Sequence, residues 1–292
     1  MDLSIYKEGN FIYFHNGIIT DKNVKLDNLD IKDNLDLVII HDIDNNCDIT
    51  LTINENISAN VLEIFYLHSN NDLDVKKKIV CKKNSNLNIT TIEHSTTNFK
   101  AKVVVDTILE ENAVITNKKL ALYINEINES ESVDLVGKKS LYDNFNVLIN
   151  ASGITQNSDL LVIHNNEDTS SVMRNYGIAK GTSTLNINTN GKVLRGAKRA
   201  SVSQKSKGIL LDMDSKISAN PWLQIDEFDC LASHGAGIGA ISEEELYYLM
   251  SRGLTRSESE RIIIDGFVSP IYKEINNEKI RKEIEDLVKK YL

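Results

Sequence analysis

Cysteine, proline and aromatic residues are scarce in this sequence of 292 residues. It contains three cysteines, two prolines and 6% aromatic residues. The cysteines, Cys47, Cys81 and Cys230, are odd in number and lie far apart. This excludes the disulfide framework of a small secreted domain and predicts reduced thiols.

Long apolar runs are also absent. No stretch approaches the roughly 20 apolar residues that cross a bilayer, and Asp2, Lys7 and Glu8 interrupt the start, where a secretory signal would lie. The net charge of -9 would repel the phosphates of a nucleic acid. We therefore expect a soluble cytoplasmic protein that binds neither nucleic acid nor a membrane.

What the sequence does contain, from about residue 35 to about residue 232, is one recurring pattern. A polar cluster rich in Asn, Asp and Ser is followed by alternating apolar positions, which is typical of short strands. Recurrence roughly every 20 to 40 residues indicates stacked coils that bury their apolar edges against one another. Asn and Asp suit the corners because they tolerate left-handed turns. The pattern alone leaves a β-sandwich as an equal alternative. Examples are residues 46–53, 84–89, 111–115, 158–163, 183–187 and 215–219.

The last fifty residues have helical signals instead. A capping box starts at Ser242 and another at Thr255, while Gly253 is suited to end the first helix. A third helix is expected from about Asn277 to Tyr291. We expect these helices to pack on the end of the β body and to cover its open edge. The chain then divides into an N-terminal segment (1–34), a β core (35–240) and a helical subdomain (241–292).

Familiar catalytic signatures are missing. Residues 137–140 imitate the end of a phosphate-binding loop, but Ser132 stands where that motif needs glycine. The sequence contains neither His-Glu-x-x-His nor Cys-x-x-Cys, so no zinc motif is visible. Five histidines are expected to be structural or on the surface: His15, His41, His68, His94 and His164.

The sixth histidine, His234, stands directly before a glycine-rich stretch that another chain or a ligand could approach closely. Cys230 lies four residues earlier. In an extended strand both would share one face about 13 Å apart, too far for one metal ion. On the residues alone, a structural histidine and a buried free cysteine are the simpler reading.

Residues 176–267 resemble the C-terminal core of the SufB/SufD family of iron–sulfur cluster assembly scaffolds. About ninety residues follow the family's motifs in order and spacing. The earlier residues resemble the family only in their strand pattern. The segments that carry the resemblance are residues 176–177, 181–183, 203–211, 220–225, 232–236 and 244–254.

The resemblance implies a mainly β fold, a right-handed parallel β-helix that dimerises through strands near Pro221 to Ser233. It also implies no enzymatic activity and a transient iron–sulfur cluster as the only cofactor. The C-terminal helices would dock SufC, the ABC-type ATPase of the system, which binds the nucleotide in place of this chain. Tyr247, Tyr248 and Arg252 are the aromatic and arginine anchors expected to bind this partner. Truncation after Ile241 is expected to abolish that binding and to leave the β body folded.

Two departures from the family pattern bear on the site. Ser215 falls where SufB-type members hold their cluster-building cysteine, so the chain is similar to SufD and a SufB-like partner is implied. His234 matches the interface histidine of SufD, which could ligate iron across the dimer contact. Ala232 replaces the cysteine often found two residues before it.

Three alternatives stay open. The chain is shorter than usual members and could be a minimal homodimeric scaffold that carries the nascent cluster itself, with Cys230 as the substitute cysteine. It could also be a purely structural interaction protein. A polysaccharide-processing β-helix enzyme is the remote alternative, because few aromatic residues are available as sugar platforms.

Overall fold

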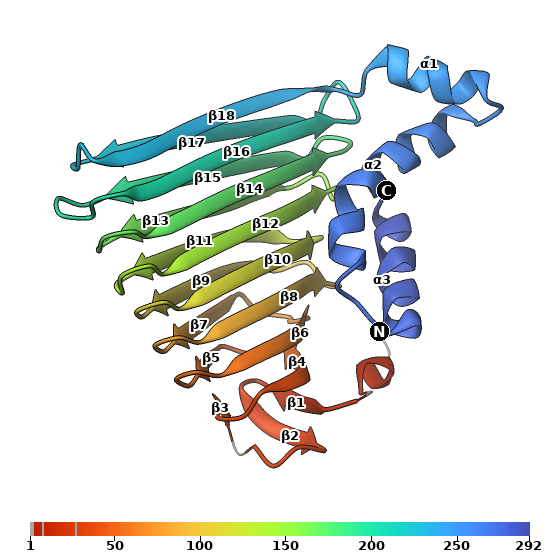
Figure 1. Ribbon diagram of the computed structural model, residues 1–292. Helices are drawn as coiled ribbons and strands as arrows, with labels where there is room; N and C mark the ends of the chain where they lie inside the picture. The colour runs from red at the N-terminus through yellow and green to blue at the C-terminus, as the bar shows by residue number, and fades with distance from the viewer. Residues whose placement is uncertain (1–2, 8, 27) are drawn as a thin grey trace.

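The chain forms a parallel β-helix, and the computed structural model describes residues 3–7, 9–26 and 28–292 of it. From β3 onward, successive strands alternate between two facing sheets, and each pairs in parallel with the strand one coil away (Figure 1). Among described pairs, β1 with β2 is the antiparallel exception. The predicted mainly β fold is confirmed, and the β-sandwich alternative is wrong.

The two sheets take their order from the coils. The ten-stranded sheet contains, in spatial order, β18 (Cys230–Ala240), β16 (Ala200–Leu210), β14 (Ser170–Ala179), β12 (Leu141–Asn150), β10 (Val114–Leu122), β8 (Asn86–Ser95), β6 (Ser58–Leu67), β4 (Leu35–Ile43), β1 (Phe11–His15) and β2 (Ile18–Lys22). The eight-stranded sheet contains β17 (Lys216–Ile225), β15 (Thr184–Val193), β13 (Thr155–His164), β11 (Glu126–Leu135), β9 (Lys100–Leu109), β7 (Leu73–Cys81), β5 (Cys47–Ile53) and β3 (Leu29–Ile31). A short 3₁₀ helix, Leu3–Tyr6, precedes them.

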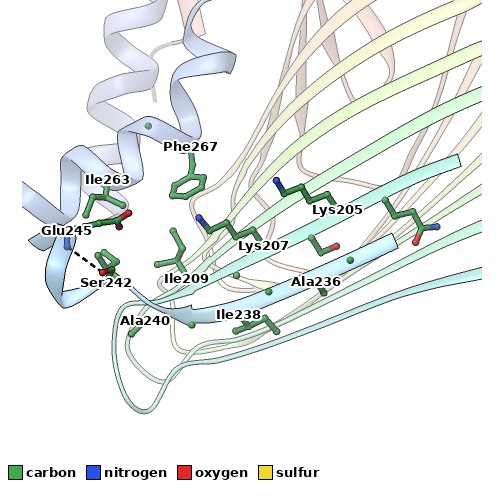
Figure 2. A pocket seen from close by; sticks show the side chains of 18 of the residues that line it. Lys205, Lys207, Ile209, Ala236, Ile238, Ala240, Ser242, Glu245, Ile263 and Phe267 are labelled. Carbon is green, nitrogen blue, oxygen red and sulfur yellow. Dashed lines mark hydrogen bonds between the residues drawn. The ribbon is translucent and has the colours of Figure 1, made fainter. Parts of the chain in front are cut away.

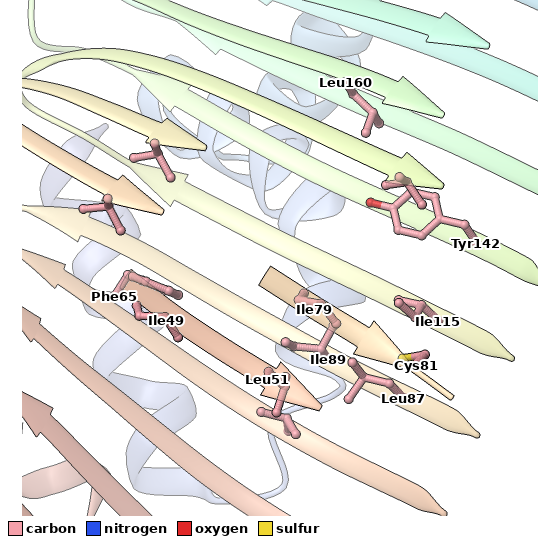
Figure 3. Packing of buried hydrophobic residues seen from close by; sticks show 14 of the residues in the cluster. Ile49, Leu51, Phe65, Ile79, Cys81, Leu87, Ile89, Ile115, Tyr142 and Leu160 are labelled. Atoms are coloured by element: carbon pink, nitrogen blue, oxygen red, sulfur yellow. The ribbon is translucent and has the colours of Figure 1, made fainter. Parts of the chain in front are cut away.

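Alternate side chains fill the space between the sheets, which we call the lumen. Equivalent positions lie in register, so that Ile115 stacks between Leu87 and Tyr142 of the neighbouring coils (Figure 3). All three are at most 1% exposed. Full burial of one such side chain stabilises a fold by roughly 1.5–3 kcal/mol. Stacking therefore lets each coil stabilise the next.

The corners between coils use the left-handed backbone that the Asn-rich clusters predicted. Asn56, Asn84 and Asn112 have φ of 60°, 58° and 55°. Their amides form a ladder in which Asn84 Nδ2 donates to Asn56 Oδ1 and Asn112 Nδ2 donates to Asn84 Oδ1, both at 2.9 Å. Lys139 and Arg199 adopt the same conformation in later coils, which composition did not predict.

Gly137 lies at one of these corners, where two coils approach closely. A Cβ atom on it would lie 1.9 Å from the backbone nitrogen of Glu111. We expect Gly137→Ala to destabilise the chain by roughly 2–4 kcal/mol, because backbone on both sides must shift. The measurement is chemical denaturation. Gly266→Ala is the matched control: a Cβ there meets nothing within 4 Å, so its stability should stay equal or rise.

Three helices follow the last strand, as predicted: α1 (Glu243–Ser251), α2 (Arg256–Tyr272) and α3 (Glu278–Tyr291). The capping box at Thr255 is complete, since its side chain accepts from the Glu258 amide and Glu258 reaches back. At Ser242 the structure describes only the serine half of the box, with Oγ accepting from Glu245 N at 3.4 Å.

The helices do not lie where we expected them. α2 and α3 run along the outer face of the ten-stranded sheet rather than over the end of the β body (Figure 1). The reason is a row of outward-facing apolar residues, one or two per coil, which the helices cover. These residues are Ile40, Ile64, Ile92, Leu120, Leu122, Val147, Ile149, Ile178 and Ile209. The division at residues 34 and 240 stays a prediction.

Candidate functional site

The terminal coil, formed by β17 and β18, is the exposed end of the β-helix. Both strands stand last in their sheets. Ten of the eleven residues of β18 are exposed, and Cys230 alone is partly covered. Elsewhere in the β-helix the next coil covers each strand. The terminal coil has no such cover, so its backbone and side chains can pair with another chain.

His234 and Cys230 both lie in β18 and face the lumen. His234 pairs in register with Gln204, and Cys230 pairs with Ala200, which is fully buried. Gln204 Nε2 crosses the lumen to donate to the carbonyl oxygen of Trp222 at 3.1 Å. Paired residues of parallel strands share a face. His234 therefore stands at the mouth of the lumen, and the unbroken strand keeps it about 13 Å from Cys230.

The thiol of Cys230 is poorly suited to bind a metal in this state. Its Sγ donates to the carbonyl oxygen of Glu227 at 3.2 Å. Desolvation, together with the carboxylates of Glu227 and Asp229, raises the pKa of Cys230. Because the thiolate is the metal ligand, the surroundings disfavour the form that would bind iron.

Ser215 does not supply a substitute ligand. It is buried in the turn before β17, and its Oγ donates to the carbonyl oxygen of Asp212 at 2.7 Å. Within the described residues, no three His, Cys, Asp or Glu side chains lie close enough to hold a metal ion. The structure brings neither Cys230 nor Ser215 to His234, so a metal at His234 would need ligands from another molecule.

A cavity of about 1400 Å³ separates the terminal coil from the first two helices (Figure 2). Its floor includes Gly235, Gly237 and Gly239, where an added Cβ would meet nothing within 4 Å. Lys207 lies over the opposite wall, with Nζ 4.8 Å from the ring centre of Phe267. His234 borders the same cavity. The sequence analysis singled out the glycine-rich stretch after His234 but not Lys207, although its position is visible in the strand pattern.

The three predicted anchors lie together at α1, with Tyr247 and Tyr248 in the helix and Arg252 at its C-cap. Tyr247 is 76% exposed and Tyr248 is 58% exposed. The Arg252 guanidinium lies 5.3 Å from the ring centre of Tyr248, a cation–π arrangement. Leu246 is the residue of α1 that is buried. α1 therefore presents most of its surface to solvent, and Tyr248 also lines the cavity that His234 borders.

Comparison with protein-family models matches residues 45–267 to the SUF system FeS cluster assembly, SufBD core domain. This range covers more than half of the chain and most of the β-helix. It includes β18 and most of α2, so the site just described lies inside the matched region. Of the helices in the described part of the chain, none is long and apolar enough to span a membrane.

Curated proteins give the same family. The iron-sulfur cluster assembly protein SufD of Bacillus subtilis (strain 168) is 26% identical over 263 residues, covering 78% of this chain and 60% of that protein. The SufBD family protein PH1385 of Pyrococcus horikoshii is 39% identical over 102 residues, 33% of this chain and 22% of that protein. The SufBD family protein Rv1461 of Mycobacterium tuberculosis is 33% identical over 120 residues, 41% of this chain and 14% of that protein. The chain spans less than two thirds of each relative. With its β-helix and the matched range, it belongs to the SufBD family of iron–sulfur cluster assembly proteins.

Proposed function

We propose that this chain is a non-catalytic, cytoplasmic scaffold subunit of an iron–sulfur cluster assembly complex that contains a SufC-like ABC ATPase. Family membership supports a part in iron–sulfur cluster assembly. The observation that supports the scaffold role is the exposed terminal coil, with His234 at the mouth of the lumen. A scaffold needs surfaces for partners and a place for the nascent cluster. The exposed strand β18 and the exposed helix α1 are such surfaces.

The ATPase docks on α1 in this proposal. The helix has two exposed tyrosines and is capped by an arginine, residue types enriched among the anchors of protein interfaces. It is also held at a distance from the strands, since it contacts α2 and is separated from β18 by the cavity. A partner can therefore bind this exposed helix without disturbing the β-helix.

A second chain pairs with the terminal coil, either a SufB-like partner or a second copy. Lys216 N donates to Ser183 O, and Asp226 N donates to Val193 O, both at 2.8 Å. The even-numbered residues of β17 therefore point their N–H groups toward β15. Pro221 therefore faces the free edge, where it removes a donor from the pairing surface. β18 contains no proline. We expect β18 to be the strand that pairs.

His234 is the proposed iron ligand at this seam, because its imidazole is exposed at the mouth of the lumen and a second chain could supply further ligands. The minimal homodimeric scaffold is the alternative. It would need Cys230 as a thiolate, and the carboxylates beside that thiol work against it. Cluster binding by His234 is therefore favoured over cluster binding by Cys230.

The native complex tests the proposed function. We expect affinity purification of the tagged full-length chain from its own cells to recover an ABC-type ATPase together with a SufB-like protein. Recovery of the ATPase with a second copy of the chain alone would instead support the minimal scaffold. Recovery of neither would contradict the proposal.

A further inference from the structure

Inside the β-helix, well away from the terminal coil, lies a group of buried charges that we call the lumen cluster. It contains four carboxyl groups and two ammonium groups, each at most 9% exposed. They occupy lumen-facing positions of β6, β7, β8, β10 and β11. The members are Glu63, Lys77, Glu93, Lys119, Glu129 and Glu131.

Two of the four carboxyl groups have a cationic partner. Glu63 forms a buried ion pair with Lys77 and also contacts Nε2 of His41 at 3.1 Å. Glu129 pairs with Lys119 at 2.5 Å. Desolvation lowers the pKa of His41 despite its contact with Glu63, so this fully buried imidazole is not counted as a further cation.

The other two carboxyl groups have neutral partners. Glu93 accepts from the Tyr123 hydroxyl at 2.7 Å, and Glu131 accepts from the Tyr142 hydroxyl at 2.6 Å. A phenol can share a hydrogen bond but cannot neutralise a charge. An ionised carboxylate that is buried without a cation costs several kcal/mol, and such a group takes up a proton instead.

We propose that the lumen cluster is a proton-binding site that holds two protons, one each on Glu93 and Glu131, when the chain is folded at pH 6. The groups that face Glu93 are Lys77 from β7, Lys119 from β10, Glu129 from β11 and the Tyr123 hydroxyl. A cavity of about 30 Å³ lies among them, room for about one water molecule. Such a water would let a proton move between the carboxyl groups.

The electrostatics agree with this count. Burial, together with the nearby Glu129 carboxylate, raises the pKa of Glu93 to about 7. Burial also raises the pKa of Glu131, against the opposing effect of Lys119. Both carboxyl groups thus bind protons more strongly in the folded chain than in the unfolded chain, where glutamate has a pKa of about 4.3.

Polar side chains link this cluster to the mouth of the lumen. Lys119, Asn146, Asn175 and Ser206 follow one another in register on β10, β12, β14 and β16. Asn146 Oδ1 and Ser206 Oγ are buried and have no hydrogen-bond partner among the described residues. Buried polar atoms of this kind are usually satisfied by ordered water. The column therefore places polar side chains between the cluster and the exposed end of the β-helix.

The site makes the stability of the fold depend on pH. Between the unfolded and folded pKa values the folded chain binds more protons than the unfolded chain, so stability falls as pH rises. The contribution of Glu93 is fully present below about pH 4 and is lost as pH rises through about 7. The contribution of Glu131 is lost in the same direction, as pH rises. Glutamine at either position keeps a hydrogen-bonding side chain of similar size and removes the titration.

A proton inventory tests the proposal. Unfolding of the wild type by denaturant at pH 6 should release about two more protons than unfolding of the double variant Glu93→Gln/Glu131→Gln, measured by titration in unbuffered solution. Each single variant should release about one proton fewer than the wild type. Glu55→Gln, on an exposed corner, is the control and should match the wild type.

A second readout uses the folded chain, so that a variant with altered stability still informs. The infrared absorption of protonated carboxyl groups should be present in the wild type at pH 6 and should weaken in each single variant. Equal proton release from wild type and double variant, or absence of that absorption from the folded wild type, would overturn the proposal.

Discussion

Alanine at Tyr247, Tyr248 and Arg252 together is expected to abolish binding of the ABC-type ATPase while the β-helix stays folded. Each anchor that fills a partner pocket contributes roughly 2 kcal/mol. Loss of about 4 kcal/mol or more weakens binding roughly a thousandfold. The fold should survive because the two tyrosines are more than half exposed and α1 buries Leu246 instead. Calorimetric titration of the purified ATPase into each variant measures the effect.

The control for this experiment is Arg281→Ala on α3. Its guanidinium lies beside Glu278 and Glu285 on a partly exposed helix surface away from α1, so ATPase affinity should not change. If the α1 variant bound the ATPase with wild-type affinity, the docking surface would have to lie elsewhere on the chain. Reduced affinity in both variants would point to a general loss of the helical region rather than to α1.

Truncation after Ile241 is not the matching experiment, although the sequence suggested it. Ile264, Ile271 and Ile284 are at most 2% exposed and pack with the outer apolar row of the ten-stranded sheet. Deleting α2 and α3 would expose that row along several coils. We therefore expect the truncated chain to aggregate or unfold, so that its loss of ATPase binding would be uninformative.

The sequence predicted the strands and the helix starts correctly, but not where the helices pack. Period-two alternation placed the strands, and Ser242 and Thr255 placed the starts of two helices, because strand periodicity and helix capping involve residues close in sequence. The position of α2 and α3 depends on outward-facing residues such as Ile64 and Ile149, which belong to different coils. Alternation within one strand does not reveal that such residues line up.

The lumen cluster was missed for a related reason. Glu129 and Glu131 stand in a polar run, Asn128 to Ser132, that looks like a solvent-facing part of a strand. In the fold they share the inward phase with Ile127 and Val133, which are buried. Their phase relative to these apolar neighbours was a usable signal. Their cationic partner Lys119 could not be identified, since pairing across the lumen depends on the coil register.

His234→Ala is expected to reduce cluster delivery roughly tenfold or more, with little effect on the fold. The imidazole is exposed at the mouth of the lumen, so its removal should change the free energy of unfolding by about 0.5 kcal/mol or less. If His234 ligates iron at the seam with a second chain, the variant removes one ligand of the metal. No neighbouring side chain in the described structure can replace it. The measurement is the activity of a cluster-dependent enzyme in cells whose sole assembly system carries the variant.

Two further measurements separate this role from a structural one. ATPase binding by His234→Ala should equal that of the wild type, because the anchors lie on α1. Cys230→Ser is the matched variant on the same strand face, and it should retain activity unless the chain works as a minimal homodimeric scaffold. Loss of activity in Cys230→Ser but not in His234→Ala would assign the cluster to the cysteine. Full activity in both variants would leave the terminal coil as a pairing surface without a metal ligand of its own.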